Sequence, residues 1–146
     1  MKKAIILFTF LLLSLSSLKA QELPALNDTN REFILANIDF QNKLKNCEPA
    51  VFYSKTTTTE IIGMKNNSCN FISECPSCTI TSMKTGKAVD ISHCNYNAPI
   101  SAVRTYANNN IKLLKYGYMI DDTELNTSQV IAMSDFAYKF SKLYCK

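Results

Sequence analysis

The pattern of apolar and polar residues changes twice along the chain, and its first regular zone is helical. Between residues 29 and 45, the positions that recur at helical spacing are Phe33, Ile34, Ile38, Gln41 and Leu44. Residues three and four apart lie on one face of a helix, so this spacing predicts a helix from about Thr29 to Lys45. Asn46, Cys47 and Pro49 are expected to end it.

The second zone is rich in β-branched and aromatic residues, which favour strands. Turn-forming residues divide it at 65–68, 75–78 and 84–87. The five predicted strands are Val51–Tyr53, Thr56–Ile62, Cys69–Glu74, Thr79–Met83 and Ala88–Cys94. Short runs with a turn every few residues are typical of an antiparallel meander. In the last run, His93 and Cys94 are expected to point to opposite faces, because strand residues alternate.

Helical spacing returns after Pro99 and continues in two segments to the C-terminus. The first apolar stripe comprises Ile100, Val103, Tyr106, Ala107, Ile111 and Leu114. Gly117 is the predicted end of this helix, through a left-handed cap. Asn126 and Gln129 have the spacing of a capping box at the start of the second helix. The second stripe comprises Val130, Met133, Phe136, Ala137, Phe140 and Leu143.

The order of these elements predicts an α+β fold. An N-terminal helix comes first, then an antiparallel meander of four to five short strands, then two C-terminal helices. Strands and helices that are segregated along a chain are typical of α+β domains, in which the helices pack on the sheet. Residues 21–146 are long enough for one such domain with its own core.

Residues 1–20 have the features of a secretory signal peptide. Lys2 and Lys3 form a basic start, an apolar run extends from Ala4 to Leu15, and Ala20 is the expected cleavage position. The apolar run is shorter than the roughly 20 residues of a transmembrane helix, so no membrane span is expected after cleavage. An uncleaved membrane anchor is the alternative. The localisation that follows is periplasmic or extracellular.

The charge of the mature chain argues against nucleic acid as a partner. Of 16 basic residues, three (Lys2, Lys3 and Lys19) would leave with the signal, so 13 would remain against 12 acidic residues. The mature chain is then nearly neutral and has no basic run. Nucleic-acid-binding proteins usually carry a basic patch that neutralises phosphates.

Six cysteines follow the signal, at Cys47, Cys69, Cys75, Cys78, Cys94 and Cys145. An even number in an exported chain predicts a disulfide-stabilised fold. In an up-and-down meander Cys47 and Cys69 lie at the same end of the sheet, which favours a bridge between them. Cys94 and Cys145 are then expected to pair with Cys75 and Cys78, in an order that the pattern leaves open.

Cys75-Pro76-Ser77-Cys78 is the sharpest candidate for chemistry, as a thiol–disulfide redox pair. Redox motifs of this spacing rely on a helix N-terminus, which lowers the pKa of the first thiol. The sequence Thr79-Ile80-Thr81 that follows favours a strand instead. The structural reading, in which both cysteines form bridges that hold the fold, is therefore preferred, and redox activity remains the alternative.

Other catalytic and metal-binding arrangements find little support in the sequence. Cys75, Cys78, Cys94 and His93 superficially resemble a zinc ribbon, but neighbouring residues on a strand cannot easily bind one ion. His93 is the single histidine and is interpreted as a half-buried sheet residue. The carboxylates Asp121, Asp122 and Glu124 are interpreted as partners of a helix N-terminus. No catalytic residue, metal ligand or cofactor is therefore assigned.

The resulting hypothesis is a small exported, disulfide-stabilised protein that acts by binding. Its partner is expected to be a protein or an envelope component. The alternative is a thiol–disulfide protein that uses Cys75 and Cys78. A third reading is a hydrolase whose site forms only in three dimensions, for example with His93 beside a buried carboxylate.

Overall fold

The computed structural model describes residues 28–146, and the signal peptide expected in residues 1–20 lies outside them. In chain order the elements are α2 (Asp28–Asn46), β1 (Ala50–Tyr53), β2 (Thr58–Lys65), β3 (Ser68–Glu74), β4 (Thr79–Thr81), β5 (Ala88–Asp90), β6 (His93–Pro99), α3 (Ile100–Gly117) and α4 (Thr127–Tyr144). A helix, a block of antiparallel strands and two C-terminal helices confirm the predicted α+β class.

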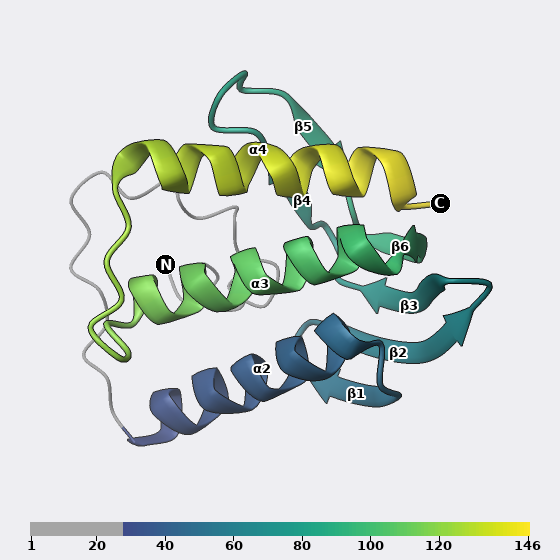
Figure 1. Cartoon of the computed structure of the whole chain (residues 1–146), viewed down its shortest axis with the longest axis horizontal. Helices are drawn as coiled ribbons and strands as arrows, with labels where there is room; N and C mark the ends of the chain where they lie inside the picture. Colours follow the sequence, from purple (N-terminus) through teal and green to yellow (C-terminus); the bar gives the residue numbers. More distant parts are fainter. Residues whose placement is uncertain (1–27) are drawn as a thin grey trace.

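The strands form two separate antiparallel sheets. β1, β2, β3 and β6 make a four-stranded sheet in that order, whereas β4 pairs with β5 in a sheet of two. β6 runs along β3 from Ser68↔Pro99 to Glu74↔His93, so the β4–β5 hairpin is an insertion between neighbouring strands. α3 lies between α2 and α4 (Figure 1), and the three helices pack on the same side of the large sheet.

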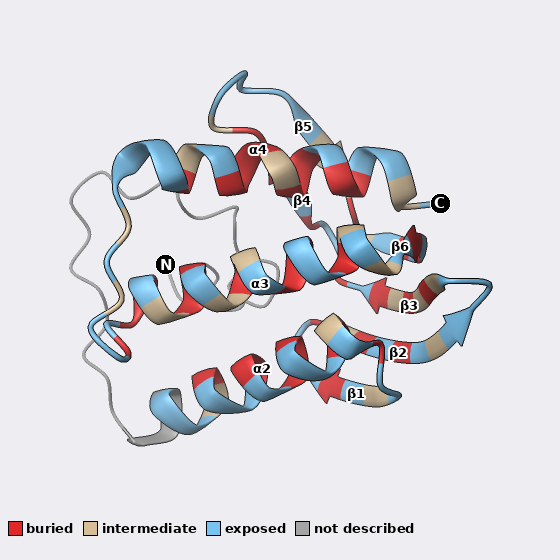
Figure 2. Ribbon diagram, viewed as in Figure 1, coloured by how far each residue is buried: buried red, intermediate tan, exposed pale blue. Residues whose placement is uncertain are grey.

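Side chains of the large sheet alternate between a covered inner face and an outer face. On β6, Cys94, Tyr96 and Ala98 are buried, while His93, Asn95, Asn97 and Pro99 are exposed. Figure 2 shows the same alternation of red and blue along the strands. Because directly paired residues point to the same face, the pairing register assigns each row of residues to one face. The inner rows contact the helices and form the core.

An aromatic stack joins the inner face of the sheet to α3 and α4. The ring centroid of Phe140, on α4, lies 4.3 Å from that of Tyr106 and 5.7 Å from that of Tyr96. Tyr96 in turn stacks on Phe71 of β3 at 4.3 Å. Burial raises the pKa of Tyr96 to about 12, and its hydroxyl lies 3.2 Å from the Ser141 hydroxyl. The stacked rings and the Tyr96–Ser141 hydroxyl contact therefore both contribute to the packing of the core.

A polar ladder lies between α2 and α3. The Asn110 amide donates to Gln41 Oε1 at 3.2 Å, and the Gln41 amide donates to Asn37 Oδ1 at 3.4 Å. All three residues are buried, beside a smaller apolar cluster that includes Ile34 and Leu114. Leaving a buried amide without a partner costs about 1–3 kcal/mol. The ladder therefore disfavours sliding of one helix along the other.

The β4–β5 hairpin is held to α4 by a second polar cluster. The Ser82 hydroxyl donates to Asp135 Oδ1 at 2.8 Å, and Lys139 Nζ lies 2.8 Å from Asp135 Oδ2. The Met83 amide donates to Ser134 Oγ at 3.1 Å. Bonds from Lys139 and then from Ser82 hold the pKa of the Asp135 carboxyl below its usual value. The hairpin is thus attached to the helix by an ionised carboxylate.

Replacement of Asp135 with asparagine is expected to destabilise the protein by about 1–2 kcal/mol at neutral pH, because a charge-assisted bond is lost. The pKa of the Asp135 carboxyl is lower in the folded protein than the value near 3.9 of an aspartate in the unfolded chain. Its stabilising effect is therefore complete at pH values above that unfolded pKa, and it is lost as the pH falls through the folded pKa. Urea denaturation of both proteins at several pH values would measure the difference, which should vanish in acid.

The control for Asp135 is Asp39→Asn. Asp39 Oδ2 lies 3.2 Å from Lys43 Nζ on the exposed face of α2, and the Asp39 side chain is 66% exposed. Exposed ion pairs contribute little, so this change is expected to cost less than about 0.5 kcal/mol. An equal loss in both variants, or a loss in Asp135→Asn that persists in acid, would contradict the assigned role of the carboxylate.

The predicted helices are observed with small shifts, but two details differ. The fifth predicted strand, Ala88–Cys94, is interrupted, because the Asp90 carboxylate accepts bonds from the Ser92 amide and hydroxyl and turns the chain. The predicted left-handed cap at Gly117 is wrong: Gly117 is the last, buried residue of α3, and Met119 has the positive φ of 51°. The capping box of Asn126 and Gln129 is confirmed.

Candidate functional site

The six cysteines form three disulfides. Cys47 is bonded to Cys69, which confirms the predicted pair. Cys75 is bonded to Cys78, and Cys94 to Cys145. The expectation that Cys94 and Cys145 pair with Cys75 and Cys78 is therefore wrong. It assumed that the fourth predicted strand continues the meander beside β3, whereas that run pairs with β5 outside the large sheet.

The Cys75–Cys78 turn does not have the surroundings of a redox motif. Both cysteines are only 2% exposed, and strand β4 follows them instead of a helix. A thiolate here would have neither a helix N-terminus to stabilise it nor access to a substrate thiol. Backbone bonds from the Cys78 amide to the Cys75 carbonyl (3.0 Å) and from the Cys75 amide to the Ser92 carbonyl (2.9 Å) hold the turn. This bridge closes a loop that is already ordered.

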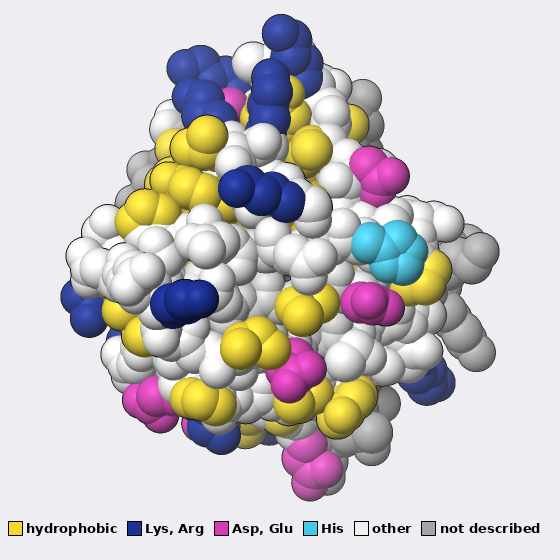
Figure 3. Space-filling model, turned by 90° about the vertical axis from the view of Figure 1, so that its right-hand side faces the viewer, with side chains coloured by type: hydrophobic (Ala, Val, Ile, Leu, Met, Phe, Trp, Pro, Cys, Tyr) yellow, Lys and Arg dark blue, Asp and Glu magenta, His cyan; other side chains and the backbone are white. Residues whose placement is uncertain are grey.

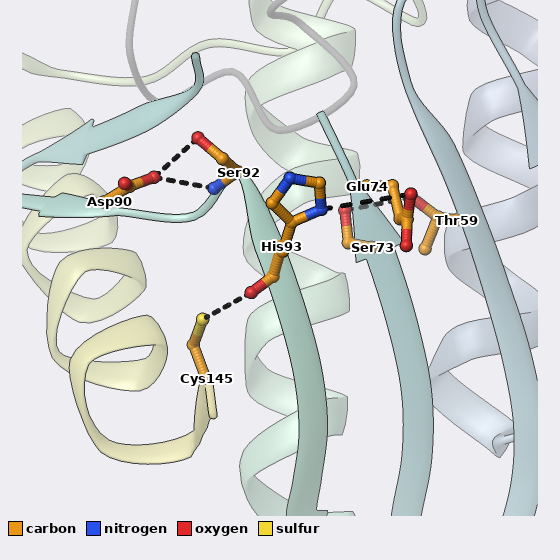
Figure 4. Close-up of polar contacts among 7 residues, drawn as sticks. All are labelled: Thr59, Ser73, Glu74, Asp90, Ser92, His93 and Cys145. Carbon is orange, nitrogen blue, oxygen red and sulfur yellow. Dashed lines mark hydrogen bonds and ion pairs between the residues drawn. The ribbon is translucent and has the colours of Figure 1, made fainter. Parts of the chain in front are cut away.

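His93 is an exposed residue, which corrects its interpretation as half-buried. Its ring Nδ1 lies 3.9 Å from the Glu74 carboxylate, and the two side chains are 73% and 62% exposed. Figure 4 shows this pair at the ends of β6 and β3, with the helices behind the strands. Cys94 points to the inner face and is bonded to Cys145. Among residues 28–146, no group of three or more histidine, cysteine or acidic side chains could hold a metal ion, and the carboxylate beside His93, that of Glu74, is exposed.

The carboxylates that precede α4 do not act on its N-terminus as expected. Asp121 is bonded to Lys115 in the last turn of α3, at 2.6 Å. Asp121 and Asp122 both have positive φ, of 57° and 48°, so they form the tight connection between the helices. The Asn126 side chain caps α4, and the first turn of α4 contains no acidic residue. The acidic cluster therefore serves the turn.

A cavity of about 500 Å³ lies beside this turn. Its lining comprises Tyr116, Met119, Thr123, Glu124, Leu125, Asn126 and Gln129. Asn126 and Gln129 form the capping box: the Asn126 amide donates to Gln129 Oε1 and the Gln129 amide donates to Asn126 Oδ1, each at 2.9 Å. The titratable side chains that line the cavity are Glu124 and Tyr116, and its lining contains no histidine or cysteine.

The outer face of the four-stranded sheet has a different character, because large apolar side chains gather on its β1–β2 side. Among the described residues, eight large hydrophobic side chains are exposed, and four of them lie on β1 and β2. They are Val51 (43%), Tyr53 (71%), Ile62 (51%) and Met64 (49%). Met64 pairs with buried Cys69 and so belongs to an inner row, which leaves Val51, Tyr53 and Ile62 on the outer face. The pairing of Val51 with Glu60 and of Glu60 with Ile72 places Val51 and half-buried Ile72 in one outward row. We call Val51, Tyr53, Ile62 and Ile72 the outer patch.

A β-bulge lies at Ile62, within this patch. The β2–β3 register shifts between Ile61 and Gly63, so Ile62 is the extra residue. Ile61 is 2% exposed and points to the core, whereas Ile62 is exposed. Gly63 has a φ of 127°, a conformation that side-chain-bearing residues rarely adopt, so glycine is required here. Alternation after buried Ile61 thus places Ile62 on the outer face, and the bulge keeps Gly63 in an outer row, opposite Asn70.

Polar and acidic residues cover the β3–β6 side of the same face. The row Thr58–Glu74–His93 lies at one end, and Asn70 pairs with Asn97 at the other. Glu60 stands between Val51 and Ile72 in the pairing register. Figure 3 shows hydrophobic and acidic side chains interspersed in the lower half of the view, with a group of lysines and arginines at the top and others near the margins. The outer face therefore combines apolar contact area with carboxylates and amides.

The outer patch could have been anticipated in part. The alternation of Val51, Phe52 and Tyr53 placed Val51 and Tyr53 on one face of a predicted strand, yet gave no sign of which face the helices cover. Alternation likewise separates Ile61 from Ile62, whereas the bulge changes the facing of the residues that follow Ile62. Within residues 28–146, no helix has the length and apolar character needed to cross a membrane.

In comparisons with protein-family models, curated proteins and solved structures, none matches this chain. The surface itself is therefore the basis for a functional proposal.

Proposed function

We propose that this chain is a small exported binding protein, stabilised by disulfides, that binds a protein partner through the outer patch. One observation carries the proposal: three of the eight exposed large apolar side chains of residues 28–146 lie together on the outer face of β1 and β2. Exposed apolar side chains scattered singly are ordinary, whereas a cluster rimmed by polar residues is typical of an interaction site. Glu74 and the asparagines of β3 and β6 supply such a rim, and Glu60 lies within the patch, between Val51 and Ile72.

Export is supported by the signal-like residues 1–20 and by the three disulfides. Disulfides persist in oxidising compartments and are rare in the cytosol. One bridge joins the residue after α2 to β3, and another joins β6 to the C-terminus, so two strands of the sheet are held covalently. A face that is exposed and rigid loses little conformational entropy on binding.

The alternative, thiol–disulfide exchange at Cys75 and Cys78, has one observation in its favour, which is that these two cysteines pair with each other. Their burial and the strand that follows them argue the other way, because an attacking thiolate needs access and its product thiolate needs stabilisation. Binding is the function that the geometry supports better.

The experiment places a photo-crosslinking phenylalanine analogue at position 62, in the producing cells, and the same analogue at position 119 as the control. Met119 is 71% exposed but lies at the α3–α4 turn, away from the patch. A discrete adduct with another protein is expected from position 62 and not from position 119. Identical adducts from both positions, or none from position 62, would contradict the proposal.

The partner identified in the adduct is then purified, and its affinity is measured by calorimetry. Ile62→Ser is expected to weaken binding by about tenfold or more, the effect typical of an apolar side chain at the centre of an interface. Met119→Ser should leave the affinity unchanged. Because Ile62 is solvent-exposed, its replacement should not affect folding, which thermal unfolding would check.

A further inference from the structure

The two edges of the four-stranded sheet differ. At β6 the edge is closed by the C-terminus: the Asn95 amide donates to the Lys146 carbonyl at 3.1 Å, and the Lys146 amide donates back to Asn95 at 3.3 Å. The Cys94–Cys145 disulfide fixes this pairing covalently. At the other edge, β1 has β2 as its strand partner on one side, and within residues 28–146 no strand pairs with its other side.

The free edge of β1 has few of the features that prevent strand pairing. Native edges are usually protected by charged residues, proline or bulges within the strand. β1 reads Ala50-Val51-Phe52-Tyr53 and contains none of these, and its short length is its main protection. Its outward side chains, Val51 and Tyr53, are 43% and 71% exposed. In Figure 1, β1 forms the lower margin of the strands. An uncharged strand edge that carries apolar side chains is suited to pairing with another strand.

We propose that the occupant of this edge is β1 of a second copy of the chain, paired antiparallel about a two-fold axis at Phe52. This register places Val51 opposite Tyr53 of the second copy, and Tyr53 opposite its Val51. Both members of each pair then point to the outer face, as direct pairing requires. Pairs of an aromatic and a β-branched residue are among the favourable cross-strand combinations. The edge is therefore complementary to itself, which a symmetric dimer needs.

The residues that flank β1 support the antiparallel direction. Glu48 precedes β1 and Lys55 follows it in the turn to β2, so the Lys55 end of one strand would lie at the Glu48 end of the other. Glu48 and Lys55 are both exposed, and the axis brings opposite charges together at both ends of the paired strands. The two four-stranded sheets would join into one continuous sheet, and the two outer patches would meet across the axis. The pairing does not depend on the proposed function, since it requires no other protein.

Sedimentation equilibrium of the purified protein, with its disulfides intact, tests the dimer. Val51→Lys/Tyr53→Lys places lysine opposite lysine in both outward pairs and should raise the dimer Kd by about tenfold or more. Val51→Lys/Tyr53→Glu places opposite charges together in the proposed register, so its Kd should return to within about threefold of the original at low salt. All these positions are exposed, so the folded monomer should tolerate the changes.

Ile62→Lys is the matched control, because it adds the same charge to the same face but one strand away from the edge. It should leave the dimer Kd within about threefold while disrupting the proposed partner site, which keeps failure of the two proposals distinguishable. A monomer at all concentrations, an Ile62→Lys variant that alone dissociates the dimer, or no recovery in Val51→Lys/Tyr53→Glu would each overturn the pairing. Occupation of the β1 edge by a strand of a different protein would overturn it as well.

Discussion

Replacement of Phe140 with alanine is expected to lower the free energy of unfolding by about 3–5 kcal/mol, the range for removal of a buried phenylalanine. Phe140 is 3% exposed and lies at the centre of the aromatic stack. Its ring centroid lies 4.3 Å from that of Tyr106 on α3, 5.7 Å from that of Tyr96 on β6 and 5.1 Å from that of Tyr144 on its own helix. One side chain thus fills the space between two helices and the sheet.

The loss should be large because the surrounding rings cannot easily close the space. Tyr96 is bonded to Ser141, and Phe71 is held in the middle of the sheet, so both are fixed in place. A cavity that does not collapse adds its own cost to the lost burial. Urea denaturation followed by circular dichroism would measure the change.

Leu143→Ala is the control for Phe140→Ala. Leu143 lies on the same helix and is 66% exposed, so its replacement should cost less than about 0.5 kcal/mol. A loss of similar size in the two variants would show that the effect arises from α4 itself and not from the stack. Phe140→Leu should fall between the two, since it keeps part of the volume.

Removal of the Cys94–Cys145 bridge by a double change to serine is expected to cost about 4 kcal/mol, because its cysteines are 51 residues apart and the bridge restricts a long loop in the unfolded chain. The same change should loosen the end of α4. The backbone pairing of Asn95 with Lys146 depends on that end remaining beside β6. Urea denaturation measures the stability, and amide exchange at Asn95 and Lys146 reports the local opening.

The Cys75–Cys78 bridge provides the internal comparison. Its cysteines are three residues apart, so its removal should cost less than about 2 kcal/mol by the same chain-entropy estimate. Hydrogen bonds of the Cys75 and Cys78 amides and carbonyls already hold that turn. A greater loss from the short bridge than from the long one would contradict this ranking. It would also mean that the turn positions the β4–β5 hairpin more strongly than its backbone contacts indicate.

These features together describe a sheet that is held firmly on its inner side and at one edge. The aromatic stack and two long-range disulfides hold the helices and the C-terminus in place. The outer patch and the β1 edge are the surfaces proposed for partners. The two surfaces share Val51 and Tyr53, and Ile62, one strand away from the edge, distinguishes the two proposals by experiment.

Helix positions were the most predictable part of the fold, since their signals are local. The helix expected at about Thr29–Lys45 is observed at Asp28–Asn46, and the capping box at Asn126 starts α4 as expected. The Cys47–Cys69 pair was also predictable, because β1, β2 and β3 are consecutive strands joined by short turns. Each of these features depends on residues that are close in sequence.

The remaining disulfides and the candidate site required long-range information. β6 pairs with β3 across the inserted hairpin, which moves Cys94 away from Cys75 and toward Cys145. No residue in the fourth predicted strand distinguishes a strand of the large sheet from one of a separate hairpin. His93 was interpreted as half-buried because alternation alone does not reveal which face of a strand is covered.

Periodicity, cysteine number and the signal-like N-terminus were enough to predict an α+β fold, its helices, disulfides and an exported location, since each is a property of local residue order. The strand order, two of the three disulfide pairs and the outer patch follow from packing, and so they became visible in the assembled fold. The physical reason is that a side-chain pattern tells which residues share a face. Which element covers that face depends on contacts between residues far apart in the chain, and the face left uncovered is the one available to partners.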